Sequence, residues 1–224
     1  LEFRRVLFRS LGTFMPPWAV INDSTLLRTL SRGLVLDGVA EAFKVAIIKD
    51  ADFFAFLETH AEELADPDSE ALHAAVRRSA ELHADHIMTN GDPFEKGTAR
   101  PLDFGHWAAH RLEAMSEYRI RHGQGVAIGI AIDAAYAASL DLLSIEERDR
   151  IHAALRRAGL ATWDPLLEER DGNGCLRVFD GIAQFREHLG GQLAVTFPNP
   201  IGQRIELSEI DEQRMEAAIR GVKS

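Results

Sequence analysis

The segment 126–143, VAIGIAIDAAYAASLDLL, most constrains how this chain can fold, because it comes nearest to eighteen uninterrupted apolar residues. A membrane-spanning helix needs about 20 predominantly apolar residues. Asp133 and Asp141 interrupt the segment, and many of its other residues are Ala or Gly, which let neighbouring helices approach closely. The segment therefore predicts a buried helix with close neighbours, over about residues 125–139, and not a membrane span.

Composition excludes several classes of protein. The 224 residues are 46% hydrophobic and 27% charged, which describes an ordered globular chain that can bury one sizeable core or two small ones. The single cysteine, Cys175, cannot form an intrachain disulfide, which favours a cytoplasmic location. The formal net charge of −10 argues against nucleic acid or an anionic membrane as a partner.

The chain divides into three unequal parts. The first ten residues, LEFRRVLFRS, match what cloning sites and sequencing adaptors encode, so we expect residues 1–10 to be a non-native leader. Residues 11–30 contain two prolines and a short β-like run at 19–21, which we expect to be the last strand of a larger unit. We expect residues 31–224 to form a mainly α domain.

Helix signals dominate the domain. Ser144 and Glu147 fit a capping box, and Gly159 fits the end of the same helix. The runs QLAVTF and RIEL, on either side of PNPIGQ, predict a late β-hairpin within residues 192–207. Apolar periodicity and capping residues predict helices at about 24–30, 37–48, 51–64, 69–87, 101–115, 125–139, 144–159 and 208–220.

A charged pair stands inside an otherwise apolar helix, VAEAFKVAIIKD. Glu41 and Lys44 are three residues apart and therefore share a face. Burying a carboxylate and an ammonium costs several kcal/mol each unless they are paired or bound to something. Two interpretations remain open: a structural ion pair, or a metal ligand beside a substrate-binding lysine.

Histidines supply the second candidate group. His106 and His110 lie one helical turn apart in LDFGHWAAH, with Asp103 just upstream, and His122 follows in RIRHGQG at the start of a helix. A His-x-x-x-His pair is a usable metal motif that also occurs often by chance. Two histidines and a buried glutamate would give zinc three protein ligands and leave positions open for substrate, as in catalytic zinc sites.

The other polar residues leave more alternatives open. A local basic cluster, which either holds a phosphate or carboxylate or pairs with Glu113 and Glu117 on a solvated face, consists of Arg100, Arg111, Arg119 and Arg121. His152 has no evident partner and is expected at the surface.

Three ordered motifs resemble the carboxy-terminal part of the dehydroquinate synthase-like sugar phosphate cyclases. GVAEAFKVAIIKDADFF resembles the family's G-x-AE-x-x-K helix, PLDFGHWAAHRLE its L-N-F-G-H-x-x-x-H-x-x-E segment, and RHGQGVAIG its HGE-x-VAIG segment. The resemblance runs from about Gly12 to the C-terminus. It implies the helical metal-binding domain of that fold, with a short leading strand and a late hairpin.

The resemblance also implies roles for individual residues. It implies that Glu41, His106 and His122 bind zinc or cobalt, and that Lys44 and His110 contact substrate. The family uses tightly bound NAD to oxidise a ring alcohol, eliminates phosphate, restores the alcohol and closes the ring by an aldol reaction. The segment that reaches back to NAD in the family matches Leu26, Leu27, Arg28 and Thr29. The implied partner is a small sugar phosphate, and a homodimer is one possible assembly.

Departures from the family pattern concern the substrate. Asp103 stands where dehydroquinate synthases carry Asn, Gln124 where they carry Glu, Asp85 about where they carry Lys, and the expected arginine is displaced to Arg100. These positions hold the carboxylate and ring hydroxyls of the substrate in those enzymes. We therefore expect catalytic roles for Asp103 and Arg100 on a related substrate, such as a heptulose 7-phosphate.

The NAD-binding domain of the family has no counterpart in this sequence beyond residues 11–30, which match its final strand and linker. We therefore expect the chain as given neither to bind NAD tightly nor to turn over. A non-catalytic helical metal-binding or interaction protein of the same fold is the alternative function.

Overall fold

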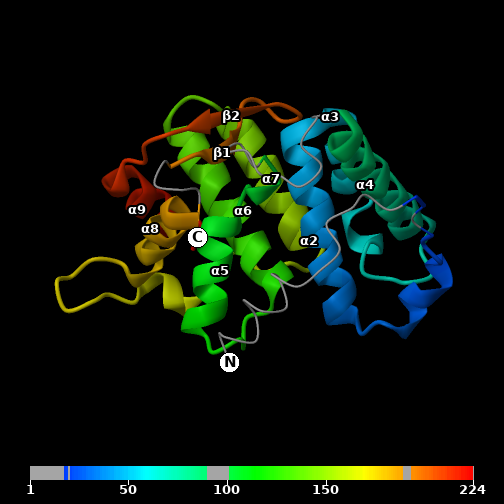
Figure 1. Ribbon diagram of the computed structural model, residues 1–224, viewed down its shortest axis with the longest axis horizontal. Coiled ribbons are helices and arrows are strands. Elements are labelled where there is room, and N and C mark those ends of the chain that lie inside the picture. The colour runs from blue at the N-terminus through cyan, green and yellow to red at the C-terminus, as the bar shows by residue number, and fades with distance from the viewer. Residues whose placement is uncertain (1–17, 20, 90–100, 189–192, 224) are drawn as a thin grey trace.

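The computed structural model describes residues 18–19, 21–89, 101–188 and 193–223. The leader at 1–10 and Arg100 lie outside the described residues. The chain is mainly α, as the sequence predicts, with short 3₁₀ helices (η) between the α-helices and one hairpin (Figure 1). The elements in chain order are η1 (Ser24–Thr29), α2 (Arg32–Lys49), α3 (Ala51–Thr59), η2 (Ala61–Glu63), α4 (Glu70–Thr89), η3 (Pro101–Asp103), α5 (His106–Met115), α6 (His122–Ser139), α7 (Ile145–Arg157), η4 (Pro165–Glu168), η5 (Arg177–Phe179), α8 (Asp180–His188), β1 (Val195–Pro198), β2 (Arg204–Leu207) and α9 (Glu212–Gly221).

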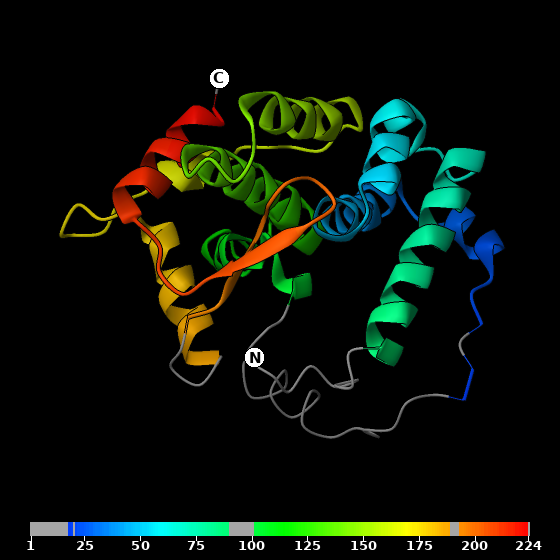
Figure 2. The ribbon, with the colours of Figure 1, turned by 90° about the horizontal axis from the view of Figure 1, so that it is seen from above.

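Helix α6 is the centre of the fold. It packs against α2, α5, α7, α9 and β1, and residues on all its faces are buried, including Val126, Ile130 and Asp133. Figure 2 shows α3 and α4 at one side of this helix and α8 and α9 at the other. The apolar segment therefore forms a buried helix with close neighbours, as predicted. Among the residues that the structure describes, no helix is both long and apolar enough to cross a membrane.

Local hydrogen bonds explain where several helices begin and end. The Ser31 hydroxyl accepts a hydrogen bond from the Leu34 N–H at the start of α2, and the Asp50 carboxylate does the same for Phe53 in α3. Ser144 and Glu147 form the predicted capping box of α7. Gly159 takes a φ of +88° just beyond this helix, where residues other than glycine are strained.

The late hairpin is confirmed. β1 and β2 pair antiparallel, with Val195 opposite Leu207 and Pro198 opposite Arg204. β1 is buried along its whole length against the helices, whereas β2 alternates between exposed and half-buried residues. The hairpin thus covers one end of the helical core.

The leading strand expected at 19–21 is not formed at Ala19 or Ile21, the two residues of that run that the structure describes. A strand needs a neighbour for its N–H and C=O groups. The two strands of the described chain, β1 and β2, pair with each other, and neither pairs with Ala19 or Ile21. Ile21 is accordingly 91% exposed.

Two predicted helices are each divided. Residues 101–115 form η3 and α5, because Gly105 between them adopts a φ of +77°. Residues 51–64 form α3 and η2, which meet at His60. Helix α8 was not predicted from the sequence.

Candidate metal centre

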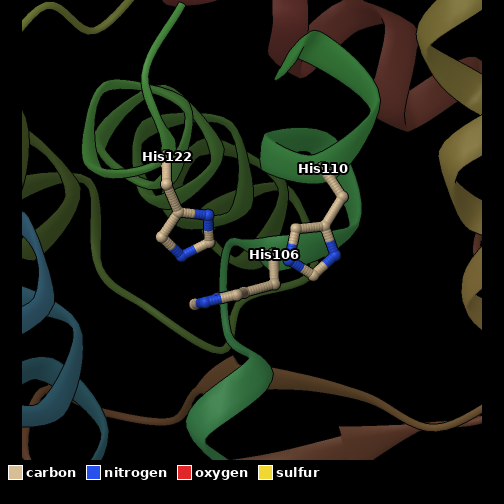
Figure 3. A group of neighbouring side chains, drawn as sticks. All are labelled: His106, His110 and His122. Atoms are coloured by element: carbon tan, nitrogen blue, oxygen red, sulfur yellow. The ribbon is translucent and has the colours of Figure 1, made fainter. Parts of the chain in front are cut away.

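Three helices bring the predicted metal ligands together. Glu41 lies in α2, His106 is the first residue of α5, and His122 is the first residue of α6. His110 follows one turn after His106 on the same helix, and Figure 3 shows the three imidazoles side by side. One ring nitrogen from each histidine lies within 4.8 Å of the others, so the three form a group that could hold a metal ion.

Glu41 completes the group with a negative charge. Its Oε1 atom lies 3.3 Å from Nε2 of His122 and 3.8 Å from Nε2 of His106. Its Oε2 atom forms an ion pair with Nζ of Lys44 at 2.5 Å, and the lysine side chain is buried. The ion-pair interpretation of Glu41 and Lys44 is therefore confirmed through one carboxylate oxygen. The other oxygen faces the histidines, and its role as a metal ligand stays a prediction.

In both predicted histidine ligands, Nδ1 is held by a hydrogen bond and Nε2 faces Glu41. Nδ1 of His106 lies 3.1 Å from the carbonyl oxygen of Phe104, and Nδ1 of His122 lies 3.0 Å from a carboxylate oxygen of Glu113. An oxygen at Nδ1 holds a proton there, so Nε2 is the nitrogen of each ring that a metal would take. One carboxylate and two oriented imidazoles form a donor set that suits zinc or cobalt.

The charges of these groups follow from their surroundings. Burial and then the charge of Lys44 lower the pKa of His106 to about 4, so this imidazole is neutral, the form that binds metals. The hydrogen bonds that His122 donates to Glu113 and then to Glu41 raise the pKa of His122 to about 9, so this imidazole carries two protons at neutral pH and would have to release the Nε2 proton to a bound metal. Burial raises the pKa of Glu41, but the hydrogen bond with His122 and the charge of Lys44 outweigh it and bring the pKa to about 2.

Glu113 is a site residue that the sequence analysis missed. It was considered only as a partner for arginines, yet it accepts a hydrogen bond from His122. A signal was present, because Glu113 lies three residues after His110 and seven after His106, which places all three on one face of α5.

The structure also places Asp103 and the four predicted cofactor contacts, Leu26–Thr29. Asp103 ends η3, three residues before His106, and is half-buried. A cavity of about 390 Å³ between α2 and α4 is lined by Leu27, Glu41 and Lys44 among others, so it connects η1 with the charged pair. The remaining predicted cofactor contacts lie on the exposed part of η1: Leu26, Arg28, whose side chain pairs with Asp68, and Thr29.

The described arginines of the basic cluster are each paired with an aspartate. Among its described members, Arg111 pairs with Asp180 and Arg119 with Asp164. Arg121 pairs with Asp37 at 2.7 Å. Each guanidinium thus ties together segments distant in sequence.

Gln124 also has a local partner. Its side-chain oxygen accepts a hydrogen bond from the N–H of Arg121 at 3.0 Å and so caps the start of α6. Gln and Glu offer the same acceptor for this bond. The departure from the family's HGE motif therefore leaves the helix start intact.

Residues 38–173 match the family model described as the 3-dehydroquinate synthase C-terminal domain. The match covers more than half of the chain and includes every described residue predicted to bind metal or contact substrate from α2 to α6. The chain belongs to this family. The helical fold of the described residues is that of the 3-dehydroquinate synthase C-terminal domain, as the resemblance implied.

Individual relatives agree with this assignment. The chain is 33% identical over 210 residues to the 3-dehydroquinate synthase of Idiomarina loihiensis, an alignment that covers 93% of the chain and 57% of that enzyme. Its structure resembles that of the 2-epi-5-epi-valiolone synthase of Streptomyces hygroscopicus with NAD⁺ and Zn²⁺ bound, with a TM-score of 0.84, 25% identity and coverage of 95% and 57%.

A second solved structure shares the fold. The 2-deoxy-scyllo-inosose synthase complexed with carbaglucose-6-phosphate, NAD⁺ and Co²⁺ gives a TM-score of 0.71 at 19% identity, with coverage of 94% of this chain and 58% of that one. This chain therefore spans little more than half the length of these relatives. NAD⁺ with Zn²⁺ or Co²⁺ in the two solved cyclases matches the cofactors predicted from the sequence.

Proposed function

We propose that this chain is the metal- and substrate-binding part of an NAD-dependent sugar phosphate cyclase, a carbon–oxygen lyase that eliminates phosphate from a seven-carbon sugar phosphate and closes the product into a ring by an intramolecular aldol reaction. One observation carries the proposal: Glu41 Oε1 lies close to Nε2 of both His106 and His122. In each of these rings, Nδ1 is hydrogen-bonded to a protein oxygen. A cytoplasmic location and a homodimer belong to the same proposal.

Each residue of the site has a task in this reaction. Glu41, His106 and His122 would hold zinc or cobalt. Lys44 fixes the second oxygen of Glu41 and lies beside the proposed metal site, where its positive charge would help to hold an anionic substrate. His110 is exposed, and its ring centre lies 5.4 Å from that of His106 and 5.5 Å from that of His122, so it can exchange a proton with a substrate oxygen held beside the ion.

Bound NAD would oxidise and later restore a ring alcohol, and a bound metal ion would polarise the oxygen of that alcohol. Asp103 lies close to the start of α5 and would orient the substrate hydroxyls. The cavity that connects Leu27 of η1 with Lys44 supports placing NAD near Leu26–Thr29. Arg100 completes the proposed set as a contact for the substrate.

The substrate we favour is a heptulose 7-phosphate without a carboxylate. Asp103 places an acid where dehydroquinate synthases have a neutral amide, and Gln124 is engaged in the cap of α6. The negative charge of Asp103 would repel a carboxylate on the substrate.

Calorimetric titration of zinc into the full chain and into Glu41→Ala and His106→Ala tests the ligand set. His60→Ala is the matched control, because this histidine pairs with Glu63 on η2, away from the three imidazoles. We expect one zinc per chain in the wild type and control, and at least 100-fold weaker binding in the two ligand variants. Equal affinity in all four proteins would refute the site.

Phosphate release tests the reaction itself. A longer protein that joins this chain to an NAD-binding domain is loaded with zinc and NAD and offered heptulose 7-phosphate, heptulosonate 7-phosphate and glucose 6-phosphate. Release from the first substrate, lost in Lys44→Met, supports the proposal. Tight zinc binding without release from any of the three favours the non-catalytic metal-binding alternative.

A further inference from the structure

One buried carboxylate lies outside the proposed ligand set. Asp133 is in the apolar helix α6 and has no exposed surface. Burial raises its pKa to about 7, although hydrogen bonds from Trp107 and Gly105 act in the opposite direction. A carboxylate buried without a cationic partner costs stability, and an apolar residue would pack at this position at lower cost. The contacts of Asp133 should therefore explain why a carboxylate stands at this position.

Asp133 binds the two residues on either side of His106. Its Oδ2 atom accepts a hydrogen bond from the backbone N–H of Gly105 at 3.0 Å, and its Oδ1 atom accepts one from the indole N–H of Trp107 at 2.8 Å. The imidazole of His106 is itself held by the carbonyl of Phe104. The carboxylate thus fixes the first turn of α5 through the residues just before and just after His106.

The start of α5 needs such a contact. Gly105 precedes the helix with a left-handed φ of +77°, and no side chain caps the helix at this position. The first N–H groups of a helix lack partners within the helix. The Asp133 carboxylate therefore acts from a second helix on the backbone that sets the position of His106.

Asp133 also continues a row of small residues on α6. Gly125, Gly129 and Asp133 follow one another at four-residue steps and so share one face. A Cβ atom on Gly125 would lie 3.0 Å from Cα of Ala109, and one on Gly129 only 2.0 Å from the carbonyl oxygen of Gly105. α5 and α6 therefore touch through their backbones along this row. His122 begins the same helix, so the row also sets the distance between the histidines of the two helices.

We propose that Asp133 is a positioning residue for the metal centre, which acts through the Gly105 N–H and the Trp107 indole to hold His106 in place for its ligand partners on α2 and α6. The inference rests on the proposed metal site. A merely structural carboxylate would change the stability of the metal-free protein and leave the affinity and geometry of the metal site unchanged.

Four variants separate these roles. Asp133→Leu removes both hydrogen bonds, Asp133→Asn keeps an acceptor for only one of the two N–H groups, and Trp107→Phe removes the indole donor. Tyr136→Phe is the matched control on the same helix. The Tyr136 hydroxyl accepts a hydrogen bond from the N–H of Asp211 at 2.9 Å, at the start of α9 and away from α5.

The measurements are the zinc Kd by competition with a chelator, the visible absorption spectrum of the cobalt-loaded protein, and thermal unfolding of the metal-free protein. We expect zinc binding about 10- to 100-fold weaker in Asp133→Leu and about 10-fold weaker in Asp133→Asn and Trp107→Phe, with altered cobalt bands in all three. The control should keep the wild-type Kd and spectrum even where it unfolds earlier.

Wild-type Kd and cobalt spectra in folded Asp133→Asn and Trp107→Phe would overturn the positioning role, whatever their stability. These two variants decide the question if Asp133→Leu does not fold. Failure of the wild-type protein itself to bind zinc or cobalt would instead refute the proposed metal site, so the two failures are distinguishable.

Discussion

The contact between α5 and α6 makes Gly129→Ala a sharp test of the packing described above. The added Cβ would lie 2.0 Å from the carbonyl oxygen of Gly105, whereas carbon and oxygen normally stay about 3.3 Å apart or more. The two helices would therefore have to separate by about 1.3 Å. The clashing atom belongs to the backbone, so it cannot move away by a rotamer change as the end of a flexible side chain could.

The size of the effect follows from two opposing contributions. Alanine in place of glycine inside a helix stabilises it by about 1 kcal/mol. Overpacking of a close contact costs about 1–3 kcal/mol and sometimes more, and the clash with backbone favours the upper end. We expect Gly129→Ala to lower the free energy of unfolding by about 2 kcal/mol, which corresponds to a fall in Tm of about 4–8 °C for a chain of this size.

Thermal and urea unfolding of the metal-free protein measure this change. The matched control is Gly38→Ala in α2, where an added Cβ meets nothing within 4 Å. The control should be stabilised by about 1 kcal/mol through helix propensity alone. If Gly129→Ala were as stable as Gly38→Ala, the close backbone contact between α5 and α6 would be refuted. The zinc Kd of Gly129→Ala should also rise, because separation of the helices moves His106 away from His122.

Three further predictions concern the metal centre and its surroundings. Glu113→Gln should weaken zinc binding about 10- to 100-fold, because the carboxylate at Nδ1 of His122 is lost; chelator competition measures the Kd, and an unchanged value would contradict the contact. Zinc at 100 times its Kd should raise the free energy of unfolding by about 2.7 kcal/mol and the Tm by about 5–11 °C, reversed by EDTA; a Tm that ignores zinc would contradict binding to the native state. His152→Gln should make the free energy of unfolding depend less steeply on pH below 6.5. Burial lowers the pKa of His152 below its usual 6.5, so in acid the unfolded chain binds a proton that the native state does not. In the wild type this histidine should therefore lower the free energy of unfolding by up to about 1.4 kcal/mol for each pH unit below 6.5. Urea unfolding at pH 7.5 and 5.5 measures the slope, and equal slopes in variant and wild type would contradict this assignment.

Local features were predictable where the signal itself is local. The capping box of Ser144 and Glu147, the left-handed Gly159 and the pairing of β1 with β2 all follow from residues close together in sequence. Helical spacing likewise placed His106 and His110 on one face of α5. Composition and spacing alone, however, reach only a mostly helical chain with a possible metal site. The family resemblance was needed to assign Glu41, His106 and His122 definite roles as ligands.

The features that were missed depend on partners distant in sequence. His152 was expected at the surface, yet it is buried and its Nε2 lies 2.9 Å from the carbonyl oxygen of Ala131 in α6. Asp133 was noted only as an interruption of an apolar segment, because its donors lie on another helix. The strand expected at 19–21 failed for the same reason, since strand propensity does not supply a neighbouring strand.

The positions of His106 and His122 as first residues of α5 and α6 have an electrostatic consequence. The N-terminus of a helix carries about half a positive charge from its aligned peptide dipoles. Two such ends converge where the imidazoles meet, so they attract the oxygens of an anionic substrate and disfavour a cation. Glu41 is the negatively charged member of the proposed ligand set and has to offset both dipoles. Its replacement by a neutral residue should therefore weaken metal binding more than the replacement of either histidine.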